Sequence, residues 1–466
     1  MQVQIPGEKI NEQIDICAEI RRTFESAGRC PLALVDTYGC QQNEADSQII
    51  RGLLALCGYE MTEDEDAADL VIINTCAVRE HAEMRVLGNI GALTHTKRRN
   101  PEQIIALCGC MVQQEHMVEK IRRSYRHVDL VFGTHAVWRL PELLLRILSE
   151  RGRVFDIDGS GAVAEGLPQH RSGSVKAWLS VMYGCNNFCS YCVVPYVRGR
   201  ERSREPDRIL DEARELIDSG YRDITLLGQN VNSYGKDLAN VHSFARLISE
   251  ISELSGDFRL RFMTSHPKDA TDELFEAMAR SPKIAKHLHL PLQSGSDRVL
   301  GAMNRGYGIS EYGALIKRAR QLMPELVITS DIIVGFPGET EEEFQQTLDA
   351  VRDIGYDALF TFIYSKREGT PAARIPDVIS REQKQLRFDA LLSLQNGISE
   401  AKHAAYIGTV QRVLIDGEIG DSRYNLSSRT DGGRLVHLRG DPALVGQFAD
   451  AKISESRTWA LFGEII

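Results

Sequence analysis

Apolar runs alternate with amphipathic stretches along most of this chain. Runs such as LALV and LVII are typical of strands buried on both faces of a parallel sheet, and the stretches between them are long enough for crossover helices. The first four apolar runs are residues 32–35, 70–73, 104–107 and 130–132. They predict an open parallel α/β domain over residues 31–147. A leading helix over residues 11–27, to which we assign no function, precedes it.

The alternation resumes after a polar segment. Residues 148–173 are rich in glycine and serine and predict a linker. Further strands are expected at residues 177–184, 224–230, 259–265, 287–293, 327–335 and 358–365. Six strand–helix units in a row predict a partial (β/α)6 barrel over residues 171–402, with functional groups at the carboxyl ends of its strands.

The pattern changes again in residues 403–466. Short β segments such as GTVQRVLIDGEI and RLVHLRG are separated by glycine and aspartate turns, without long helices between them. This predicts a small all-β barrel or sandwich, an architecture that often binds oligonucleotides. The fold class is therefore α/β with a third, all-β domain.

Composition indicates the class of protein and the compartment in which we expect it. The 466 residues are 43% hydrophobic and 26% charged, which is ordinary for a globular protein. We expect no membrane association and a cytoplasmic location, because no apolar run approaches the roughly 20 residues of a membrane span and the N-terminus lacks a signal-peptide core. In a reducing compartment the ten cysteines are thiols or metal ligands. The net charge of −10 argues against indiscriminate nucleic-acid coating but leaves room for a structured RNA held by a local basic patch.

Three cysteines lie close together in the run CNNFCSYC, directly after the first strand of the second domain. They are Cys185, Cys189 and Cys192. Half of a zinc knuckle would look similar, but no fourth Cys or His follows at a suitable spacing. Three thiolates on a cubane iron–sulfur cluster leave one iron open, and that iron can chelate the amino and carboxylate groups of S-adenosylmethionine.

Three further cysteines are dispersed, and each lies just past a predicted strand of the first domain. They are Cys40 in TYGCQQNEADS, Cys76 in NTCAVRE and Cys110 in GCMVQQE. Because strand-to-helix loops gather at one edge of an open α/β sheet, we expect the three thiols to meet there and to hold a second open cluster. A buried free cysteine is often only a small apolar residue, and Cys17, Cys30 and Cys57 fit that description.

Some neighbours of the dispersed cysteines have two interpretations. Cys108 and Cys110 point to the same side of an extended strand, but only Cys110 lies clearly in the loop, so we prefer Cys110. Gln41, Asn43 and Asn74 can donate hydrogen bonds to cluster sulfurs. Helix capping accounts equally well for Asn43, and a strand-end turn accounts for Asn74.

Glycine-rich and polar loops follow the strands of the second domain. Loops of this kind at the functional rim let the backbone approach a ligand, although glycine and proline also simply turn a chain. As cofactor-binding candidates we take Gly228, Gln229, Asn230, Ser265, Gln293, Ser294, Asp331 and Gly335.

An arginine-rich run, VRGRERSRE, follows the compact cysteine loop. It contains Arg198, Arg200, Arg202 and Arg204. These side chains can contact a phosphate backbone or the cofactor carboxylate, and we include Arg198 among the cofactor-binding candidates. The alternative is a solvated, charged strand edge.

Together these motifs resemble the radical S-adenosylmethionine methylthiotransferases. The resemblance rests on TYGCQQNEADS, NTCAVRE, GCMVQQE, YGCNNFCSYCVVPYVRGRERSR and DIIVGFPGETEEEF, and it runs from Leu32 to the C-terminus in the family's domain order. That order is an N-terminal methylthiotransferase domain, a radical core and a C-terminal TRAM domain. The chain departs from the family in a longer leader and in Gln42, where methionine is common.

The resemblance implies an enzyme with two [4Fe-4S] clusters and two molecules of S-adenosylmethionine per reaction. One cofactor molecule donates a methyl group to sulfur on the auxiliary cluster of Cys40, Cys76 and Cys110. The other is cleaved to a 5′-deoxyadenosyl radical at the cluster of the compact set. The methylthio group then reaches carbon 2 of an adenine base.

The implied substrate is N(6)-isopentenyladenosine next to the anticodon of tRNA, with the TRAM domain holding the anticodon arm. TYGCQQNE, NTCAVRE and CVVPYVRG resemble the branch that acts on this base. Other branches act on threonylcarbamoyladenosine in tRNA or on an aspartate of a ribosomal protein, and a zinc-containing RNA-binding protein without enzymatic activity is a further alternative. We expect a monomer that receives electrons from a single-electron donor such as a flavodoxin-type protein.

Overall fold

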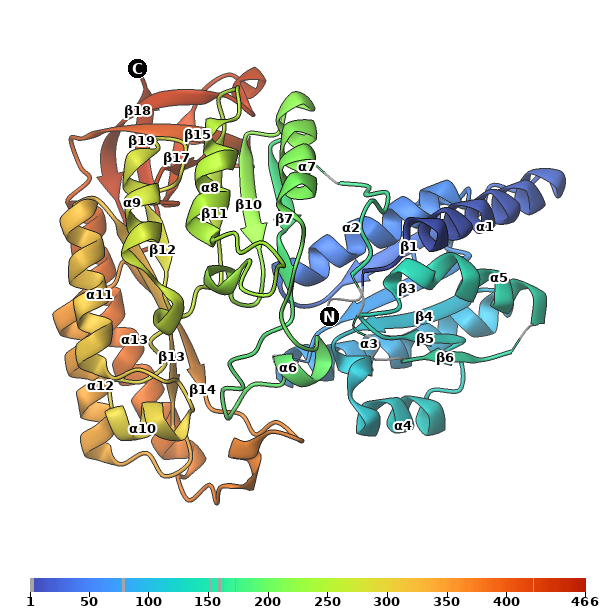
Figure 1. Cartoon of the computed structure of the whole chain (residues 1–466), viewed down its shortest axis with the longest axis horizontal. Helices are drawn as coiled ribbons and strands as arrows, with labels where there is room; N and C mark the ends of the chain where they lie inside the picture. The colour runs from blue at the N-terminus through green and yellow to red at the C-terminus, as the bar shows by residue number, and fades with distance from the viewer. Residues whose placement is uncertain are drawn as a thin grey trace. The chain divides into compact units, whose positions relative to one another are not determined.

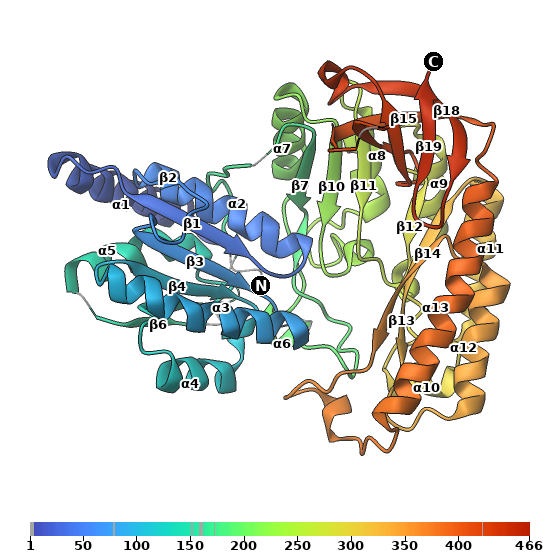
Figure 2. The ribbon, with the colours of Figure 1, turned by 180° about the vertical axis from the view of Figure 1, so that it is seen from behind.

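The structure is a computed structural model that describes residues 4–77, 80–150, 152–157, 161, 163–171, 173–421 and 423–466. The chain forms two compact units, drawn in Figures 1 and 2. The first unit comprises Met1–Ser172, Tyr183–Asn186 and Val193–Arg202. The second comprises Gly173–Met182, Asn187–Cys192 and Ser203–Ile466.

The first unit is a parallel sheet covered by helices on both faces (Figure 1). Its strands, in the order β2-β1-β3-β4-β5-β6, are β1 Leu32–Thr37, β2 Glu60–Met61, β3 Leu70–Thr75, β4 Ile104–Gly109, β5 Leu130–Phe132 and β6 Val154–Asp156. Its helices are α1 Gly7–Ser26, α2 Gln41–Leu56, α3 Glu80–Arg99, α4 Glu115–Ser124, α5 Leu140–Glu150 and the short α6 Val194–Val197. The four predicted strands are confirmed.

Two apolar cores hold this sheet. Residues of α1, α2 and α5 form one core with the strands, and residues of α3 and α4 form the other. Cys17, Ile20 and Phe24 place the leading helix inside the first core. The predicted domain of residues 31–147 is therefore too short at both ends, because α1 packs into it and β6 lies within the predicted linker.

The second unit contains the six predicted strands of the partial barrel. They are β7 Lys176–Ser180, β10 Asp223–Leu227, β11 Arg259–Phe262, β12 His287–His289, β13 Val327–Val334 and β14 Ala358–Ile363. All pair in parallel, in two three-stranded sheets, β11-β10-β7 and β12-β13-β14, and a bridge from Leu260 to Ile284 continues the pairing beyond β11. The short strands β8 Met182–Tyr183 and β9 Arg202–Ser203 form a separate pair.

Helices surround these strands on the outside (Figure 2). They are α7 Pro206–Asp218, α8 Phe244–Glu253, α9 Asp272–Arg280, α10 Asp297–Ala302, α11 Ile309–Leu322, α12 Glu341–Ile354 and α13 Arg381–Ala404. Apolar residues of the strands and of most of these helices form one continuous core. The carboxyl ends of the strands are thereby held on a rigid frame, which suits a functional rim.

The C-terminal strands close into a small barrel, so the prediction of a barrel or sandwich resolves to the barrel. The strands are β15 Val410–Glu418, β16 Leu426–Thr430, β17 Leu435–Arg439, β18 Phe448–Ser456 and β19 Leu461–Ile465. Two arginines of this barrel form ion pairs within the protein: Arg434 is buried against Asp357, and Arg429 pairs with Asp416. Within the described chain, no helix has the length and apolar character of a membrane span.

Candidate functional site

The three dispersed cysteines lie at the carboxyl edge of the first sheet. Strands β3 and β4 end in register there, because Thr75 pairs with Gly109. Cys76 and Cys110 directly follow these two residues, and the Cys110 N–H donates to the Thr75 carbonyl at 2.9 Å. Cys40 is the residue before α2, in the loop after β1. The topology thus brings together three thiols that are distant in sequence.

Two glycines permit the loops to approach this closely. Gly39 has φ +137°, and a Cβ there would lie 2.7 Å from the Cβ of Cys76. Gly109 has φ +93°, and a Cβ there would lie 2.3 Å from the Thr75 carbonyl oxygen. Each glycine directly precedes a cysteine. This crowding fits a donor set gathered around one group, as a cubane cluster with three thiolate ligands requires.

A buried amide network ties the same loops together. The Asn43 Nδ2 donates to Asn74 Oδ1 at 3.0 Å and to the Thr75 carbonyl at 2.8 Å, and Asn74 Nδ2 donates to Ser47 Oγ at 2.9 Å. The Cys40 thiol donates to Asn43 Oδ1 at 3.3 Å. Both amide N–H₂ groups are thus used within the protein, and Asn43 is not a helix cap because α2 begins two residues before it. The two asparagines hold the loops in place.

The placement of Cys108 and Cys110 favours the second as a ligand. Cys108 lies within β4, fully buried in the apolar core. Cys110 lies beyond the strand end, and burial raises the pKa of its thiol to about 12, with Arg198 acting against the shift and Cys76 and Cys40 adding to it. Iron binding would therefore release a proton from this thiol.

Arg198 contacts this cysteine set, so its predicted place in cofactor binding is not supported. Its Nε donates to Cys110 Sγ at 3.1 Å and its Nη2 pairs with Asp46 at 2.8 Å, with only 5% of the residue exposed. Arg204 is also buried and pairs with Glu212 at 2.9 Å. A solvated strand edge is therefore wrong for both arginines. Arg198 and Asp46 also line a pocket together with Trp138 and Tyr183.

The compact cysteines share one loop between β8 and α6. Within it, Phe188 has φ +47°, a left-handed conformation that is rare for a bulky residue. Its carbonyl accepts from Asn304 Nδ2 at 3.0 Å, and Asn304 is itself left-handed at φ +58°. Backbone strain of this kind persists where the surrounding structure fixes it, which is common at functional sites.

A second buried arginine contacts the compact set. Arg305 Nη1 donates to Cys189 Sγ at 3.2 Å, Nη2 to the Pro291 carbonyl at 3.0 Å and Nε to Tyr307 Oη at 2.9 Å. Burial opposes the charge, but Tyr191, Tyr307 and Cys189 raise the pKa of Arg305, so it stays cationic. A buried cation at the sulfur fits an anionic, thiolate-bound cluster.

Several buried polar atoms in the loops at the barrel rim have no hydrogen-bond partner among the described residues. They include atoms of four predicted cofactor-binding residues: Gln229 Oε1, Asn230 Oδ1, Ser265 Oγ and Gln293 Oε1. Buried polar groups are normally satisfied, so these atoms point to a polar ligand. The three amide oxygens accept hydrogen bonds, which suits donors such as the ammonium and ribose hydroxyl groups of S-adenosylmethionine, and the Ser265 hydroxyl can also donate to its carboxylate. Gln293 also has φ +77°, and Thr264 beside Ser265 has φ +69°.

Other predicted candidates are explained without a cofactor. A Cβ at Gly228 would lie 2.6 Å from Met182 Cγ, and one at Gly335 would lie 2.5 Å from Lys384 Cγ, so both glycines serve packing. Ser294 is fully buried, and its hydroxyl bonds within the protein, to the Ser296 N–H. Asp331 is partly exposed, and its carboxylate lies 3.5 Å from His289.

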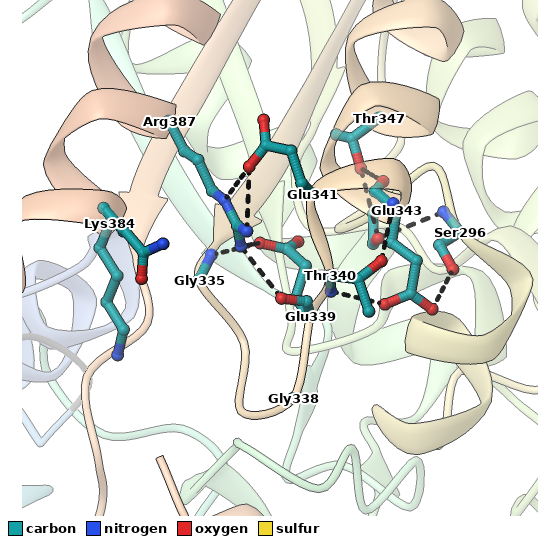
Figure 3. Close-up of polar contacts among 12 residues, drawn as sticks. Ser296, Gly335, Gly338, Glu339, Thr340, Glu341, Glu343, Thr347, Lys384 and Arg387 are labelled. Carbon is teal, nitrogen blue, oxygen red and sulfur yellow. Dashed lines mark hydrogen bonds and ion pairs between the residues drawn. The ribbon is translucent and has the colours of Figure 1, made fainter. Parts of the chain in front are cut away.

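The loop after β13 that carries Gly335 is fixed by a buried ion pair (Figure 3). Glu339 accepts from the Gly335 N–H at 2.8 Å and from Arg387 Nη1 at 2.9 Å. Arg387 reaches from α13 and also pairs with Glu341. Thr340 and Glu343 cap α12 immediately beyond. The loop is thus held from both sides.

Three further polar residues at this rim were not among the predicted cofactor-binding residues. His266, Asn232 and Tyr364 each have a buried atom without a partner in the described part of the chain. All three follow barrel strands, and His266 stands in the SHP run next to the predicted Ser265. Their position just after predicted strands could have identified them as candidates.

His266 gives a pH-dependent prediction. Burial, together with the nearby cations Arg305, Lys268 and Lys236, lowers its pKa to about 2. The unfolded chain protonates near pH 6.5, so the stability contributed by the neutral ring is full above that pH and is lost as the pH falls below it. In the cluster-free protein, His266 should lower the free energy of unfolding by about 1.4 kcal/mol for each pH unit below 6.5. The His266→Gln variant should lack this part of the pH dependence. Urea unfolding at pH 7 and 5.5 tests this, and equal pH dependence in both proteins would contradict it.

Among the described residues, no three His, Cys, Asp or Glu side chains converge tightly enough to hold a single metal ion. A cubane cluster binds its cysteines through different iron atoms, so its ligands need not converge on one point.

Comparison with known proteins extends this picture. Residues 33–133 match the model of the uncharacterized protein family UPF0004, residues 179–351 match the radical SAM superfamily and residues 404–466 match the TRAM domain. In fold, the chain is similar to a radical S-adenosylmethionine methyltransferase from Kitasatospora setae, with a TM-score of 0.55, 16% identity and coverage of 73% of this chain and 75% of the other.

Relatives that carry an enzyme name cover most or all of the chain. A tRNA-2-methylthio-N(6)-dimethylallyladenosine synthase from Alkaliphilus oremlandii is 47% identical over 465 residues, covering 100% of this chain and 98% of its own length. Synthases of the same name from Clostridium tetani and Clostridioides difficile are 48% and 44% identical, covering 92% and 100% of this chain and 95% and 98% of their own lengths. The chain belongs to the family of the radical S-adenosylmethionine tRNA-2-methylthio-N(6)-dimethylallyladenosine synthases, which use S-adenosylmethionine and two [4Fe-4S] clusters.

Proposed function

We propose that this protein is a tRNA-modifying methylthiotransferase that converts N(6)-isopentenyladenosine next to the anticodon into its 2-methylthio derivative. The observation that carries the proposal is identity of 47% over the full chain to a synthase of that name, in a chain that has both cysteine sets. The carbon–hydrogen bond at carbon 2 of adenine is inert, so its replacement requires radical chemistry.

Each cysteine set has a separate task in this proposal. Cys40, Cys76 and Cys110 hold the auxiliary cluster, and Cys185, Cys189 and Cys192 hold the radical cluster. When bound, the clusters and S-adenosylmethionine supply the radical, the sulfur and the methyl group. The protein holds its ligands, orients the cofactor at the barrel rim and keeps the rim loops rigid.

Mass analysis of nucleosides tests the function. Reconstituted protein, reductant and S-adenosylmethionine are incubated anaerobically with an isopentenylated tRNA anticodon arm, and a threonylcarbamoylated arm is treated in parallel. We expect a 2-methylthio product on the prenylated arm alone. Product on the other arm alone would reassign the substrate. Cofactor cleavage without change in either RNA would direct the search to a ribosomal protein.

Gln293 provides a test of the cofactor site. Gln293→Asn keeps an amide that tolerates the left-handed backbone but withdraws it from the ligand. Losing one hydrogen bond to a charged group costs about 1.5–3 kcal/mol, so the Kd for S-adenosylmethionine should rise at least about tenfold. Equilibrium binding to reconstituted enzyme measures it, with iron content unchanged. Gln345→Asn, on the exposed face of α12, is the matched control, and an equal Kd in all three proteins would remove Gln293 from the site.

The C-terminal barrel is the proposed RNA contact. Trp459, in the turn between β18 and β19, is 59% exposed and can stack on an unpaired base. Nearby, His437 stacks on Phe462 with ring centroids 5.2 Å apart, and Arg457 lies over the same ring. We further propose a cytoplasmic monomer that receives electrons from a flavodoxin-type donor.

A further inference from the structure

Arg198 and Asp46 form an ion pair directly against a cysteine of the auxiliary set. Arg198 Nη2 lies 2.8 Å from Asp46 Oδ2, and the two side chains are only 6% and 11% exposed. The other edge of the guanidinium donates from Nε to Cys110 Sγ at 3.1 Å. One buried cation therefore lies between a carboxylate and a sulfur that the cluster would use.

Arg198 remains protonated in its buried position. Burial opposes it, but Asp46, Cys110 and Cys40 together raise the pKa of Arg198 well above its ordinary value. A guanidinium is not deprotonated in proteins, so a positive charge remains beside the sulfur whatever the state of the cluster. Such contacts are stronger here than at a surface, because water screens a buried charge less.

We propose that Arg198 and Asp46 are positioning residues that set the reduction potential of the auxiliary cluster, an inference that rests on its proposed assignment to Cys40, Cys76 and Cys110. Reduction adds negative charge to a cluster that its thiolates already make anionic. The guanidinium stabilises the added charge, and hydrogen bonds to cluster sulfurs act in the same direction. The negative charge of Asp46 partly cancels the effect of the guanidinium. The pair therefore keeps the reduction potential below the value expected with Arg198 alone and above the value expected without it.

The two residues therefore have opposite expected effects. Arg198→Met removes the cation and the N–H···S bond, which should lower the potential. Asp46→Asn leaves the cation without its counter-charge, which should raise it. A residue that only shapes the pocket has no reason to produce shifts of opposite sign. Each shift should amount to at least tenfold in the reduction equilibrium, which is 59 mV for one electron.

The test uses full-length protein with Cys185, Cys189 and Cys192 changed to alanine, so that only the auxiliary cluster remains. Redox titration followed by electron paramagnetic resonance gives its midpoint potential in the parent, Arg198→Met and Asp46→Asn. Arg198→Lys, which keeps the charge but not the guanidinium geometry, should fall between parent and Arg198→Met. Arg51→Met is the control, since Arg51 forms a comparable ion pair with Glu44 on α2 at 2.8 Å without a hydrogen bond to a cysteine in the described residues.

Opposite shifts at Arg198 and Asp46, with little change at Arg51, would support the proposal. Unchanged potentials, or shifts of one sign, would overturn it. If Arg198→Met does not retain iron, Asp46→Asn decides the question alone through the sign of its shift. Iron content is measured separately: a parent that bound no cluster would contradict the cluster assignment itself, and this proposal with it.

Discussion

Replacing Cys189 by alanine should abolish release of 5′-deoxyadenosine from S-adenosylmethionine. Replacing Cys76 should leave that release possible and eliminate the methylthio product. The reason is the division of roles: Cys189 belongs to the loop with the Arg305 contact, and Cys76 to the sheet edge with Asn74 and Gly39. Both products are measured in one anaerobic reaction by liquid chromatography and mass spectrometry.

Cys57→Ala is the matched control for these variants. Cys57 is fully buried in the apolar core of the first unit, away from any proposed ligand role. Folded Cys57→Ala protein should make both products. Normal methylthio product from Cys76→Ala would show that the auxiliary cluster is assigned to the wrong cysteines.

The largest effect on stability is expected at Arg387. Arg387→Met leaves the Glu339 carboxylate, only 1% exposed, without its cation and should lower the free energy of unfolding by about 3–5 kcal/mol. Burial already raises the pKa of Glu339, and loss of Arg387 would raise it further. Urea unfolding of the cluster-free protein measures the change.

Arg352→Met supplies the comparison. Arg352 pairs with Asp349 on the surface of α12, with both side chains more than half exposed, and such pairs contribute about 0–1 kcal/mol. Adding Glu339→Gln to Arg387→Met should recover part of the loss, because a neutral amide is less costly to bury unpaired than a carboxylate. Similar losses for Arg387→Met and Arg352→Met would contradict the buried-pair argument.

Strand positions followed well from sequence. Buried parallel strands are short and continuously apolar, so runs such as IIAL identified β4 and its neighbours. The cysteines remain ligand candidates, and their position after strand ends is what singled them out in the sequence. The leading helix was predicted, but its packing into the first domain was not, because α1 is polar on most of its surface. Strand β6 was missed because it is only three residues long, Val154–Asp156, in a segment rich in glycine.

Individual side chains of the site were less predictable. Sequence does not distinguish a rim-loop glycine that leaves room for a ligand from one that leaves room for a neighbouring side chain. At Gly228 and Gly335 the space is taken by a side chain, that of Met182 and of Lys384. Arg305 lies between two helices, where neither periodicity nor a strand end marks it. The contacts of Arg198 could not be predicted from sequence, because its partners Asp46 and Cys110 lie 152 and 88 residues earlier in the chain and meet it only through tertiary packing.

The short segment Val193–Arg202 also bears on how the protein folds during synthesis. It is part of the first unit, and its Val193 and Val197 pack with Ala77 and Cys110. Until the ribosome has translated residues 193–202, the edge of the sheet that carries Cys76 and Cys110 lacks the apolar side chains that cover it and the arginine that contacts Cys110. The compact cysteine loop precedes this segment in the chain, so the first unit is completed only after that loop has been synthesised.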